Sequence, residues 1–433
     1  MRRGLLLTSA IIVILLGACT APTRPAVSPE PCIPSIHPAA TPAPESSPSR
    51  VKQHGTYPRL ANYYQHLPLI DSFQAASLAK WDLIVVQYNV VRSSPNAVRL
   101  IKKLNPSISI LVWISAGLDG GWRRDRMMSE HFNENWILHY ADVPSNSKPA
   151  AERRVIMWTS KTGDNKVAGM NPASEWSTYL PRFVNERLMS SGLFDGVFYD
   201  CAWETVRKPN VDINNDGVAD SQDMIKREYQ KGMTQILRST RELLGSKAII
   251  FGNPGVQWSD GSPYWDYANG HMQENALGTM FGSSWPGIWN IYKRNMQKPS
   301  PPARIHWIAA DTNQKEFDSV APCLPLEEVQ KMRFGLAITL LGDGYFGFDE
   351  GDGLHGQLWW FREYEVNLGF ATGDAQQRSD GIWIREFENG TAIANPTARE
   401  RIIEFPVSHK DATTGTQGSR FGVPPKDGRI FTR

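Results

Sequence analysis

Two acidic side chains at the ends of expected β-strands are the strongest candidates for chemistry in this chain. Asp200 closes the apolar run Phe194-Asp-Gly-Val-Phe-Tyr-Asp200, and Glu274 follows the run that begins at Tyr267. Asp195 lies roughly 16 Å from Asp200 at about 3.3 Å per residue, so we expect it to be structural. Two carboxylates in one site can cleave a glycosidic bond, one as nucleophile and the other as general acid. We expect Asp200 to act ionised and Glu274 to supply the proton.

Polar and aromatic side chains near other expected strand ends are candidates for binding a sugar. The amide of Asn253 ends the fifth strand and can hold a hydroxyl group without titrating. Asp311 and Asp349 follow the seventh and eighth strands, where they suit sugar hydroxyls; either is also an alternative to Glu274 as the acid. Further candidates, each also ordinary packing material when taken singly, are Trp113, His271 and Trp307. The histidines lack the close ligand spacing of a zinc site.

An acidic loop after Asp200 has oxygen-bearing residues at the spacing of a calcium-binding loop. Oxygen-bearing residues recur at the spacing of a twelve-residue calcium loop, with Gly217 at the sharp turn. The predicted ligands are Asp212, Asn214, Asp216, the backbone carbonyl of Val218, Asp220 and Asp223. The alternative is a solvated acidic turn. A dockerin would carry two such loops and this chain has one, so we expect an ion that braces the loop rather than docking to a scaffold.

The N-terminus has the pattern of an exported lipoprotein. Arg2-Arg3 is a positive region, and Leu5–Leu16 is an apolar stretch too short to span a bilayer of roughly 30 Å. The following Gly-Ala-Cys19 completes a lipobox-like motif, which predicts cleavage before Cys19 and a diacylglyceryl group on its thiol. The alternative is an ordinary signal peptide cut elsewhere. We expect an envelope protein anchored in a bacterial membrane by lipid, at the cell surface or on the periplasmic side.

Composition divides the chain into four predicted segments. Residues 1–18 are the signal peptide, and residues 19–56 are rich in Pro, Ala, Ser and Thr, which suits an extended tether without a core. Residues 57–379 alternate strand-like and helical stretches at the spacing of βα units. Residues 380–433 are predicted to form a small β-rich domain packed on the larger one, because residues 381–395 alternate by twos around the turn Asn389-Gly390.

Eight strands with interleaved helices predict an α/β fold, a (β/α)8 TIM barrel with a small C-terminal β appendage. An open doubly wound sheet is the runner-up, but no Gly-rich phosphate turn follows any strand. The expected strands are residues 59–64, 83–88, 108–115, 196–200, 248–252, 267–273, 304–310 and 344–349. The expected helices are residues 95–104, 172–190, 224–244, 286–297 and 326–341.

Charge and cysteine usage limit the partners. The formal net charge is +2 and no basic run stands out, which argues against nucleic acid as a partner, and no partner protein is evident. The chain has 15 tryptophans, whose ring faces can stack on sugars but also serve as core material. Export would permit a disulfide between Cys201 and Cys323, and two free thiols are the alternative.

Several segments resemble a known family. They are Asp195-Gly-Val-Phe-Tyr-Asp200, the acidic loop, Asp343-Gly-Tyr-Phe-Gly-Phe-Asp349 with Trp359-Trp360, and Trp383-Ile-Arg-Glu-Phe-Glu-Asn-Gly390. They are similar to hypothetical glycosyl hydrolase family fifteen, a group of bacterial glycosidase-like TIM-barrel proteins, and the first is distantly similar to polygalactosaminidase-type barrels. The resemblance covers roughly residues 57–400. It implies the barrel and a glycosidase-like site with Asp200 as a leading catalytic position.

The residues and the resemblance predict an exported, lipid-anchored glycoside hydrolase. Its substrate would be a poly- or oligosaccharide, cleaved at an O-glycosidic bond by the two carboxylates. Two other classes of protein fit the same sequence. One is a non-catalytic glycan-binding surface lipoprotein, and the other is a calcium-dependent structural protein of the envelope.

Overall fold

The computed structural model describes residues 33–34, 56–65, 69–119, 127, 131–142, 147–159, 166–278, 284–298, 305–312, 323–351 and 355–433. The predicted signal peptide, Cys19 and all of the predicted tether except Ile33, Pro34 and Thr56 lie outside these residues. Within the described residues, no helix combines the length and the apolar character needed to cross a bilayer.

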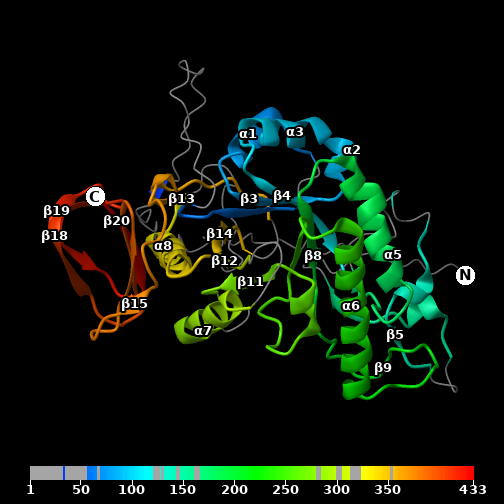
Figure 1. Ribbon diagram of the computed structural model, residues 1–433. Helices are drawn as coiled ribbons and strands as arrows, with labels where there is room; N and C mark the ends of the chain where they lie inside the picture. The colour runs from blue at the N-terminus through cyan, green and yellow to red at the C-terminus, as the bar shows by residue number, and fades with distance from the viewer. Residues whose placement is uncertain are drawn as a thin grey trace, which may run out of the picture.

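Eight parallel strands form the central sheet (Figure 1). The outer two meet through a parallel bridge between Leu60 and Phe346, and the Phe346 N–H donates to the Arg59 carbonyl at 3.0 Å. The sheet therefore nearly closes, which confirms the predicted barrel. In spatial order the strands are β2 (Ala61–Tyr64), β3 (Leu83–Gln87), β4 (Ser109–Ser115), β8 (Gly196–Asp200), β10 (Ile249–Gly252), β11 (Gly270–Ala276), β12 (Trp307–Asp311) and β14 (Tyr345–Asp349).

Helices connect most of these strands on the outside of the sheet. Polar caps mark several starts: the Ser221 side chain accepts the Met224 N–H at the start of α6, and the Ser284 side chain accepts the Gly287 N–H at the start of α7. The α-helices are α1 (Ser72–Leu78), α2 (Val90–Ser93), α3 (Pro95–Leu104), α5 (Trp176–Phe183), α6 (Gln222–Leu244), α7 (Trp285–Met296) and α8 (Leu326–Leu340).

Two connections are not fully α-helical, and one of them differs from an expected helix. The helix expected over residues 172–190 is α-helical only in α5, and it continues as a π-helix over Val184–Leu188 and a 3-10 turn over Met189–Ser191. Pro181, which has no N–H to donate, lies inside α5. Between β10 and β11 the described helical structure is the short 3-10 turn Pro263–Asp266.

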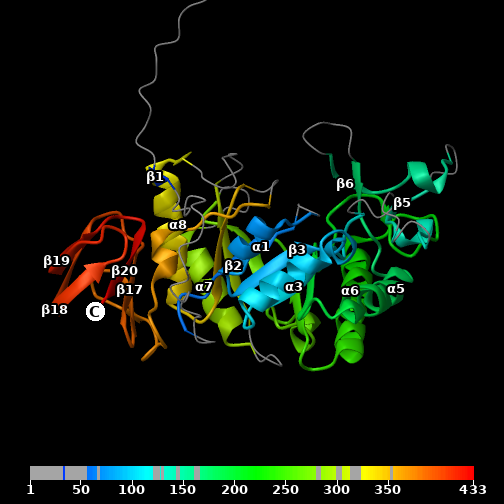
Figure 2. The same ribbon diagram turned by 90° about the horizontal axis from the view of Figure 1, so that it is seen from above.

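Short antiparallel strand pairs lie outside the barrel sheet and the C-terminal sheet. β5 (His139–Tyr140) pairs with β9 (Val211–Asp212), β6 (Ile156–Thr159) with β7 (Lys166–Ala168), and β1 (Ile33–Pro34) with β13 (Cys323–Leu324). Figure 2 shows β6 and β1, the partner strand of β13, on the same side of the barrel. Short 3-10 turns lie at Glu134–Trp136, Ala150–Glu152 and Arg362–Glu365.

The cysteines correct one alternative left open above. Cys201 is a buried free thiol, whereas Cys323 is disulfide-bonded, so the two are not joined to each other. Cys201 directly follows the end of β8, and Cys323 begins β13. Placement at one face of a barrel was therefore not enough to make them a pair.

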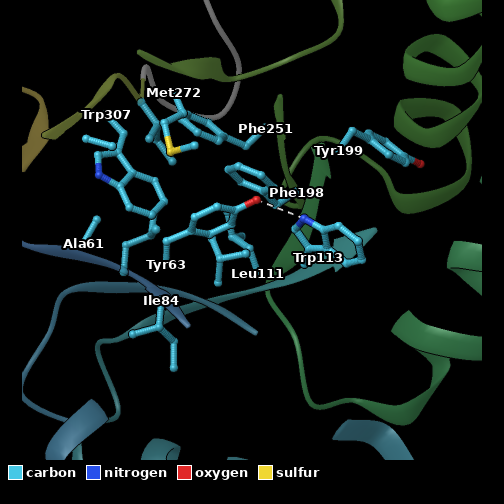
Figure 3. Close-up of a cluster of buried hydrophobic side chains, with 14 of the residues drawn as sticks. Ala61, Tyr63, Ile84, Leu111, Trp113, Phe198, Tyr199, Phe251, Met272 and Trp307 are labelled. Atoms are coloured by element: carbon cyan, nitrogen blue, oxygen red, sulfur yellow. Dashed lines mark hydrogen bonds between the residues drawn. The ribbon is translucent and has the colours of Figure 1, made fainter. Parts of the chain in front are cut away.

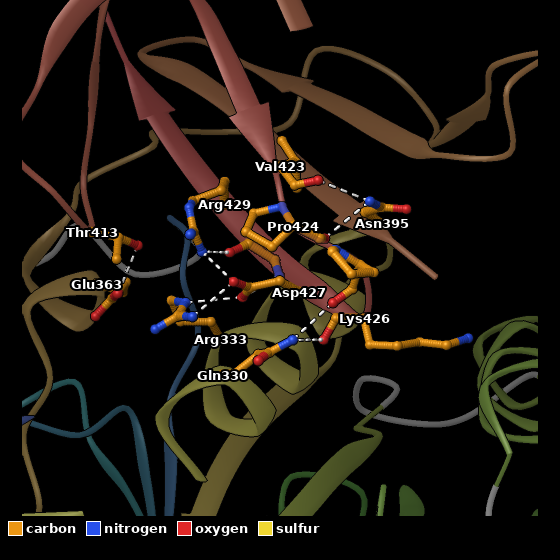
Figure 4. Close-up of polar contacts among 12 residues, drawn as sticks. Gln330, Arg333, Glu363, Asn395, Thr413, Val423, Pro424, Lys426, Asp427 and Arg429 are labelled. Atoms are coloured by element: carbon orange, nitrogen blue, oxygen red, sulfur yellow. Dashed lines mark hydrogen bonds and ion pairs between the residues drawn. The ribbon is translucent and has the colours of Figure 1, made fainter. Parts of the chain in front are cut away.

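A six-stranded antiparallel sheet follows the barrel and packs on α8 (Figures 1 and 4). Arg333 of α8 makes two hydrogen bonds to the Asp427 carboxylate, at 2.9 and 2.7 Å, and Arg429 donates to the same group at 2.7 Å. The predicted hairpin around Asn389-Gly390 is present as β16 and β17. The strands are β15 (Gln376–Gln377), β16 (Trp383–Phe387), β17 (Gly390–Asn395), β18 (Arg401–Asp411), β19 (Gln417–Val423) and β20 (Asp427–Thr432).

Aromatic side chains fill the interior of the barrel (Figure 3). The Phe198 ring lies 5.2 Å from Tyr63, 5.6 Å from Phe251 and 6.3 Å from Trp307, measured between ring centroids. Met272 and Leu111 join this layer. Because side chains alternate along a strand, these residues identify which later positions on the same strands also face the interior.

Candidate active site

Polar side chains stand above the aromatic layer at the rim, meaning the carboxyl ends of the barrel strands and the residues directly after them. Asp200 and Asn253 each lie two positions beyond an interior residue, so both face inward. Glu274 lies on the next strand, β11, at a bulge that follows the interior residue Met272. Asp311 and Asp349 are register partners at the ends of β12 and β14 and complete the acidic part of the rim. This is the end of a barrel at which active sites are built.

Asp200 is held by two N–H donors. Its Oδ1 accepts the Cys201 backbone N–H at 2.9 Å and the Asn253 side-chain amide at 2.9 Å. Burial raises the pKa of Asp200, against the lowering effect of these two bonds and of the nearby His355 and Trp113. The Asp200 residue as a whole is nevertheless only half-buried.

Glu274 lies at a bulge rather than at a strand tip. We expected β11 to end at Gln273, but it continues to Ala276, with a register shift between Gln273 and Ala276. The next residue, Asn275, has a left-handed backbone with φ of 49°, and the Glu274 N–H donates to the Gly255 carbonyl at 2.8 Å. A bulge of this kind re-aims a side chain beside a site. Glu274 is half-buried, like Asp200.

Asp200 and Glu274 act on the same neighbours. Burial, then Asp200, then Glu274 raise the pKa of the Tyr63 hydroxyl well above its usual value. The pKa of the Cys201 thiol is raised by the same three causes in the same order. Two separate side chains therefore lie within the electrostatic reach of both carboxylates, which brings Asp200 and Glu274 to one region of the rim.

The remaining polar residues at the rim are buried and bonded. Asp349 pairs with the His355 Nδ1 at 2.5 Å, and the Asp311 carboxylate accepts the Asn275 amide. Asn253 is 4 % exposed, Asp311 4 % and Asp349 6 %, so these side chains are much less accessible than Asp200 and Glu274. Their arrangement suits them to holding the rim in place more than to changing protonation in contact with substrate.

The three predicted aromatic lining residues are all buried. His271 is fully buried outside the barrel interior, against Trp258 and Trp265, and its Nε2 pairs with the Asn295 amide of α7 at 3.0 Å. Trp307 and Trp113 are also buried. Trp307 packs inside the barrel (Figure 3), and the Trp113 indole donates to the Tyr63 hydroxyl at 3.0 Å. The expectation of direct sugar contact is wrong for His271. Neighbouring side chains on a strand face opposite sides, and Met272 faces the barrel interior, so His271 faces outward.

The structure adds residues that sequence reasoning missed. The His355 ring packs against Tyr63 with centroids 4.4 Å apart and a tilt of 48°, and its position six residues after Asp349 was the available signal. Trp203, three residues after Asp200, forms a partly exposed pair with Trp158 of β6 at 6.2 Å. Trp158 is 48 % exposed, and the Lys208 ammonium group donates to the Met157 carbonyl, which ties β6 to the segment after β8. This pair depends on a tertiary contact that spacing does not reveal.

The acidic loop bonds to its own backbone. The Asp212 carboxylate accepts the Asp216 N–H at 3.1 Å and the Gly217 N–H at 2.7 Å, and Asp220 accepts the Ile213 N–H at 2.8 Å. Among the described residues, no group of three acidic, histidine or cysteine side chains is arranged to hold a metal ion. Each carboxylate oxygen keeps a second lone pair, so these bonds are compatible with a cation.

The predicted calcium ligands differ in their surroundings. Asp212 is buried, Asp220 is half-buried, and Asp223 lies in the first turn of α6. The others are exposed: Asn214, Asp216 and Val218. Asp212 is therefore the buried member of the predicted set, Asp220 is partly enclosed, and the remaining ligands are exposed.

Comparisons with solved structures return carbohydrate-active enzymes with low similarity. The family 36 α-galactosidase AgaA of Geobacillus stearothermophilus has 9 % identity and a TM-score of 0.43, covering 87 % of this chain but 55 % of its own. The isomalto-dextranase of Arthrobacter globiformis has 12 % identity and a TM-score of 0.41, covering 87 % and 72 %. The family 31 sulfoquinovosidase of E. rectale has 8 % identity and a TM-score of 0.46, covering 87 % and 61 %.

The chain spans little more than half the length of the α-galactosidase. All three TM-scores are below 0.5, so the barrel assignment rests on the strand order. No curated protein matches the sequence. A family model does match, over residues 102–391, about two thirds of the chain. The chain belongs to hypothetical glycosyl hydrolase family 15.

Proposed function

We propose that the protein is a glycoside hydrolase in which Asp200 and Glu274 form the catalytic pair. The observation that carries the proposal is the shared position of these two side chains. They belong to half-buried residues at the rim, and both raise the pKa of Tyr63 and of Cys201. Hydrolysis of a glycosidic bond needs two such groups on opposite sides of the bond. A poly- or oligosaccharide is the matching substrate class.

We assign Asp200 as the nucleophile or base and Glu274 as the general acid. The two N–H donors on Asp200 Oδ1 stabilise its ionised form. Burial works against this role, since it raises the pKa of Asp200. The role therefore depends on the donors, and an experiment that separates nucleophile from acid is needed.

Azide rescue provides that separation. Each of Asp200→Gly and Glu274→Ala is assayed on a panel of aryl glycosides with and without sodium azide. In a retaining enzyme, rescue of Asp200→Gly yields a glycosyl azide of inverted configuration, whereas rescue of Glu274→Ala yields the retained one. The opposite assignment of products would exchange the two roles. Wild-type turnover in both variants would remove the pair from the mechanism.

We also propose that the acidic loop binds calcium through Asp212, Asn214, Asp216, the Val218 carbonyl, Asp220 and Asp223. The support is the ligand spacing together with the buried Asp212 at the loop's base. The ion would brace the connection between β8 and α6. Calcium added after chelation should raise the melting temperature of the wild-type protein but not of Asp216→Ala. Equal melting temperatures with and without calcium would contradict the proposal.

Anchoring to a bacterial membrane through lipid on Cys19 is our third proposal, and it rests on the sequence motif alone. It would place the hydrolase at the outer side of the membrane, where a large glycan is accessible. Metabolic labelling with an alkyne-bearing fatty acid should mark the wild-type chain and not Cys19→Ala. Labelling of both chains would show that Cys19 is not the acceptor.

A further inference from the structure

A second site lies beside the rim, outside β11 and β12. It is a cavity of about 540 Å³ between the start of α7, the start of α8 and the turn before β20. Its volume is in the range of small-ligand sites. The described residues that line it are Leu277, Ser284, Trp285, Pro286, Glu327, Gln330, Lys331, Phe334 and Lys426.

One wall of the cavity is an aromatic surface held in place from behind. The Trp285 ring stacks on Trp289 with centroids 5.9 Å apart and an interplanar angle of 7°, and it lies 5.6 Å from Phe334. Trp289 and Phe334 are buried, whereas Trp285 stays partly exposed. Leu277 and Pro286 extend this apolar wall. The C–H face of a pyranose ring packs on such a surface.

The other wall is polar and its charges are balanced. The Lys331 ammonium group donates to the Glu328 carboxylate at 2.8 Å, so it contributes little net charge to the cavity. Glu327 and Lys426 carry opposite charges. Hydrogen-bonding groups without a dominant charge suit hydroxyl groups more than a sulfate, phosphate or carboxylate.

The cavity connects to the candidate catalytic residues through short links. Leu277 lies three residues after Glu274 on the same segment. The Lys331 ammonium group donates to the Asp311 backbone carbonyl at 2.9 Å, and the Asp311 carboxylate accepts the amide of Asn275. The cavity therefore adjoins the Glu274 side of the rim and not the Asp200 side.

The C-terminal sheet supplies part of the cavity and is fixed there. The Gln330 amide donates to the Pro425 carbonyl at 2.8 Å and to the Lys426 carbonyl at 3.2 Å (Figure 4). Lys426 has a φ of 54°, a left-handed conformation that few residues other than glycine adopt. A site whose walls are already held in place loses little entropy on binding.

We propose that this cavity is a subsite for an uncharged pyranose ring of a glycan chain whose cleaved bond lies at Asp200 and Glu274. The inference rests on the proposed function, and it specifies the substrate: a neutral chain several rings long. The C-terminal sheet then has a binding role. The leaving-group side of the chain would cross the rim at Glu274 and place a distal ring against Trp285.

Binding in a catalytically inactive background tests the subsite. Full-length Asp200→Asn protein is titrated by calorimetry with cellohexaose, maltohexaose, isomaltohexaose and xylohexaose, and with the disaccharide of each. We expect at least one hexasaccharide to bind tenfold or more tightly than its disaccharide. Adding Trp285→Leu should reduce this gain to twofold or less, because the aromatic wall is lost.

A control variant and a second cavity variant accompany Trp285→Leu. Phe370→Leu removes an aromatic side chain that is 41 % exposed and does not line the cavity, so it should leave both affinities unchanged. Lys426→Gly removes a lining side chain at a backbone position that glycine favours, and it should lower hexasaccharide affinity even if Trp285→Leu fails to fold.

The subsite and the hydrolase can fail separately. The subsite is refuted if none of the hexasaccharides binds more tightly than its disaccharide, or if the gain survives in the cavity variants. A different result would separate the two proposals. If the cavity variants lose the tighter binding of the hexasaccharide, but the wild-type protein does not cleave that hexasaccharide, the subsite is supported and the proposed hydrolase activity is contradicted.

Discussion

Two acidic regions follow one another in this chain and are built in opposite ways. At the rim, Asp200 lies on a rigid strand above a layer of aromatic side chains, and burial raises its pKa. In the acidic loop, Asp216 is exposed and its Oδ1 accepts the Val218 N–H at 2.8 Å. At the rim an aspartate is partly removed from water, whereas in the loop an aspartate is exposed and binds a nearby backbone N–H group.

The difference shows what separates a candidate catalytic carboxylate from a structural one. A carboxylate taken partly out of water loses stability when it ionises, and it regains stability by binding a proton, a substrate or a donor. A carboxylate that closes a turn has its stabilising contacts already. A high density of acidic residues is therefore a poor guide to candidate catalytic carboxylates, and their position on the barrel is a better one.

The largest expected effect separates the two regions by activity. Asp200→Asn should lower turnover by about 10³-fold, since it removes a group that contacts the reacting bond. Asp216→Asn, assayed with calcium present, should retain wild-type turnover. Initial rates on the same aryl glycoside measure both. Equal losses in the two variants would mean that the loop, and not only the rim, takes part in the reaction.

The acidic loop should matter more for stability than for turnover. Asp212→Ala removes an acceptor that binds the N–H groups of Asp216 and Gly217 and leaves both donors without it. We expect the free energy of unfolding to fall by about 1–3 kcal/mol. Urea denaturation measures the change, with Asp374→Ala, at an exposed aspartate outside the loop, as a control. An unaltered midpoint for Asp212→Ala would show that the loop does not depend on it.

The bond between Asn253 and Asp200 should be visible in the pH profile. The Asn253 amide lowers the pKa of Asp200, so Asn253→Ala should raise that pKa further. If Asp200 must be ionised, the acidic limb of kcat/KM moves to higher pH. If the acidic limb of the variant's pH profile stays at the wild-type position, the ionisation that controls activity is not that of Asp200.

The smallest expected effect is on the stability of Asp200→Asn itself. The native state holds the Asp200 proton more tightly than the unfolded chain, because its native pKa is raised. The contribution of Asp200 to stability therefore falls as pH rises from the ordinary aspartate value through the native one. Asn does not titrate, so Asp200→Asn should gain in melting temperature relative to wild type over that window. A difference that is constant with pH would contradict the raised pKa.

Periodicity predicted the barrel well because it reports burial directly. β8 and α3 have the expected bounds, and the other barrel strands differ by a few residues at their ends. The π-helical segment after α5 was not foreseen, since residues 172–190 read as one helical stretch. The bulge at Glu274 was missed for a related reason: it depends on the Gly255 carbonyl of a neighbouring segment.

The sequence by itself determined the order of the barrel strands, the family, and Asp200 as the leading candidate, because alternation and strand ends are local properties. Only the tertiary structure decided that His271 faces away from the interior, that Cys201 is a free thiol and that Trp285 and Lys426 share a cavity. These outcomes depend on which distant segments pack together. Such packing is set by the closing of the sheet and by the docking of α8 against the C-terminal strands, and spacing along the chain carries no record of either.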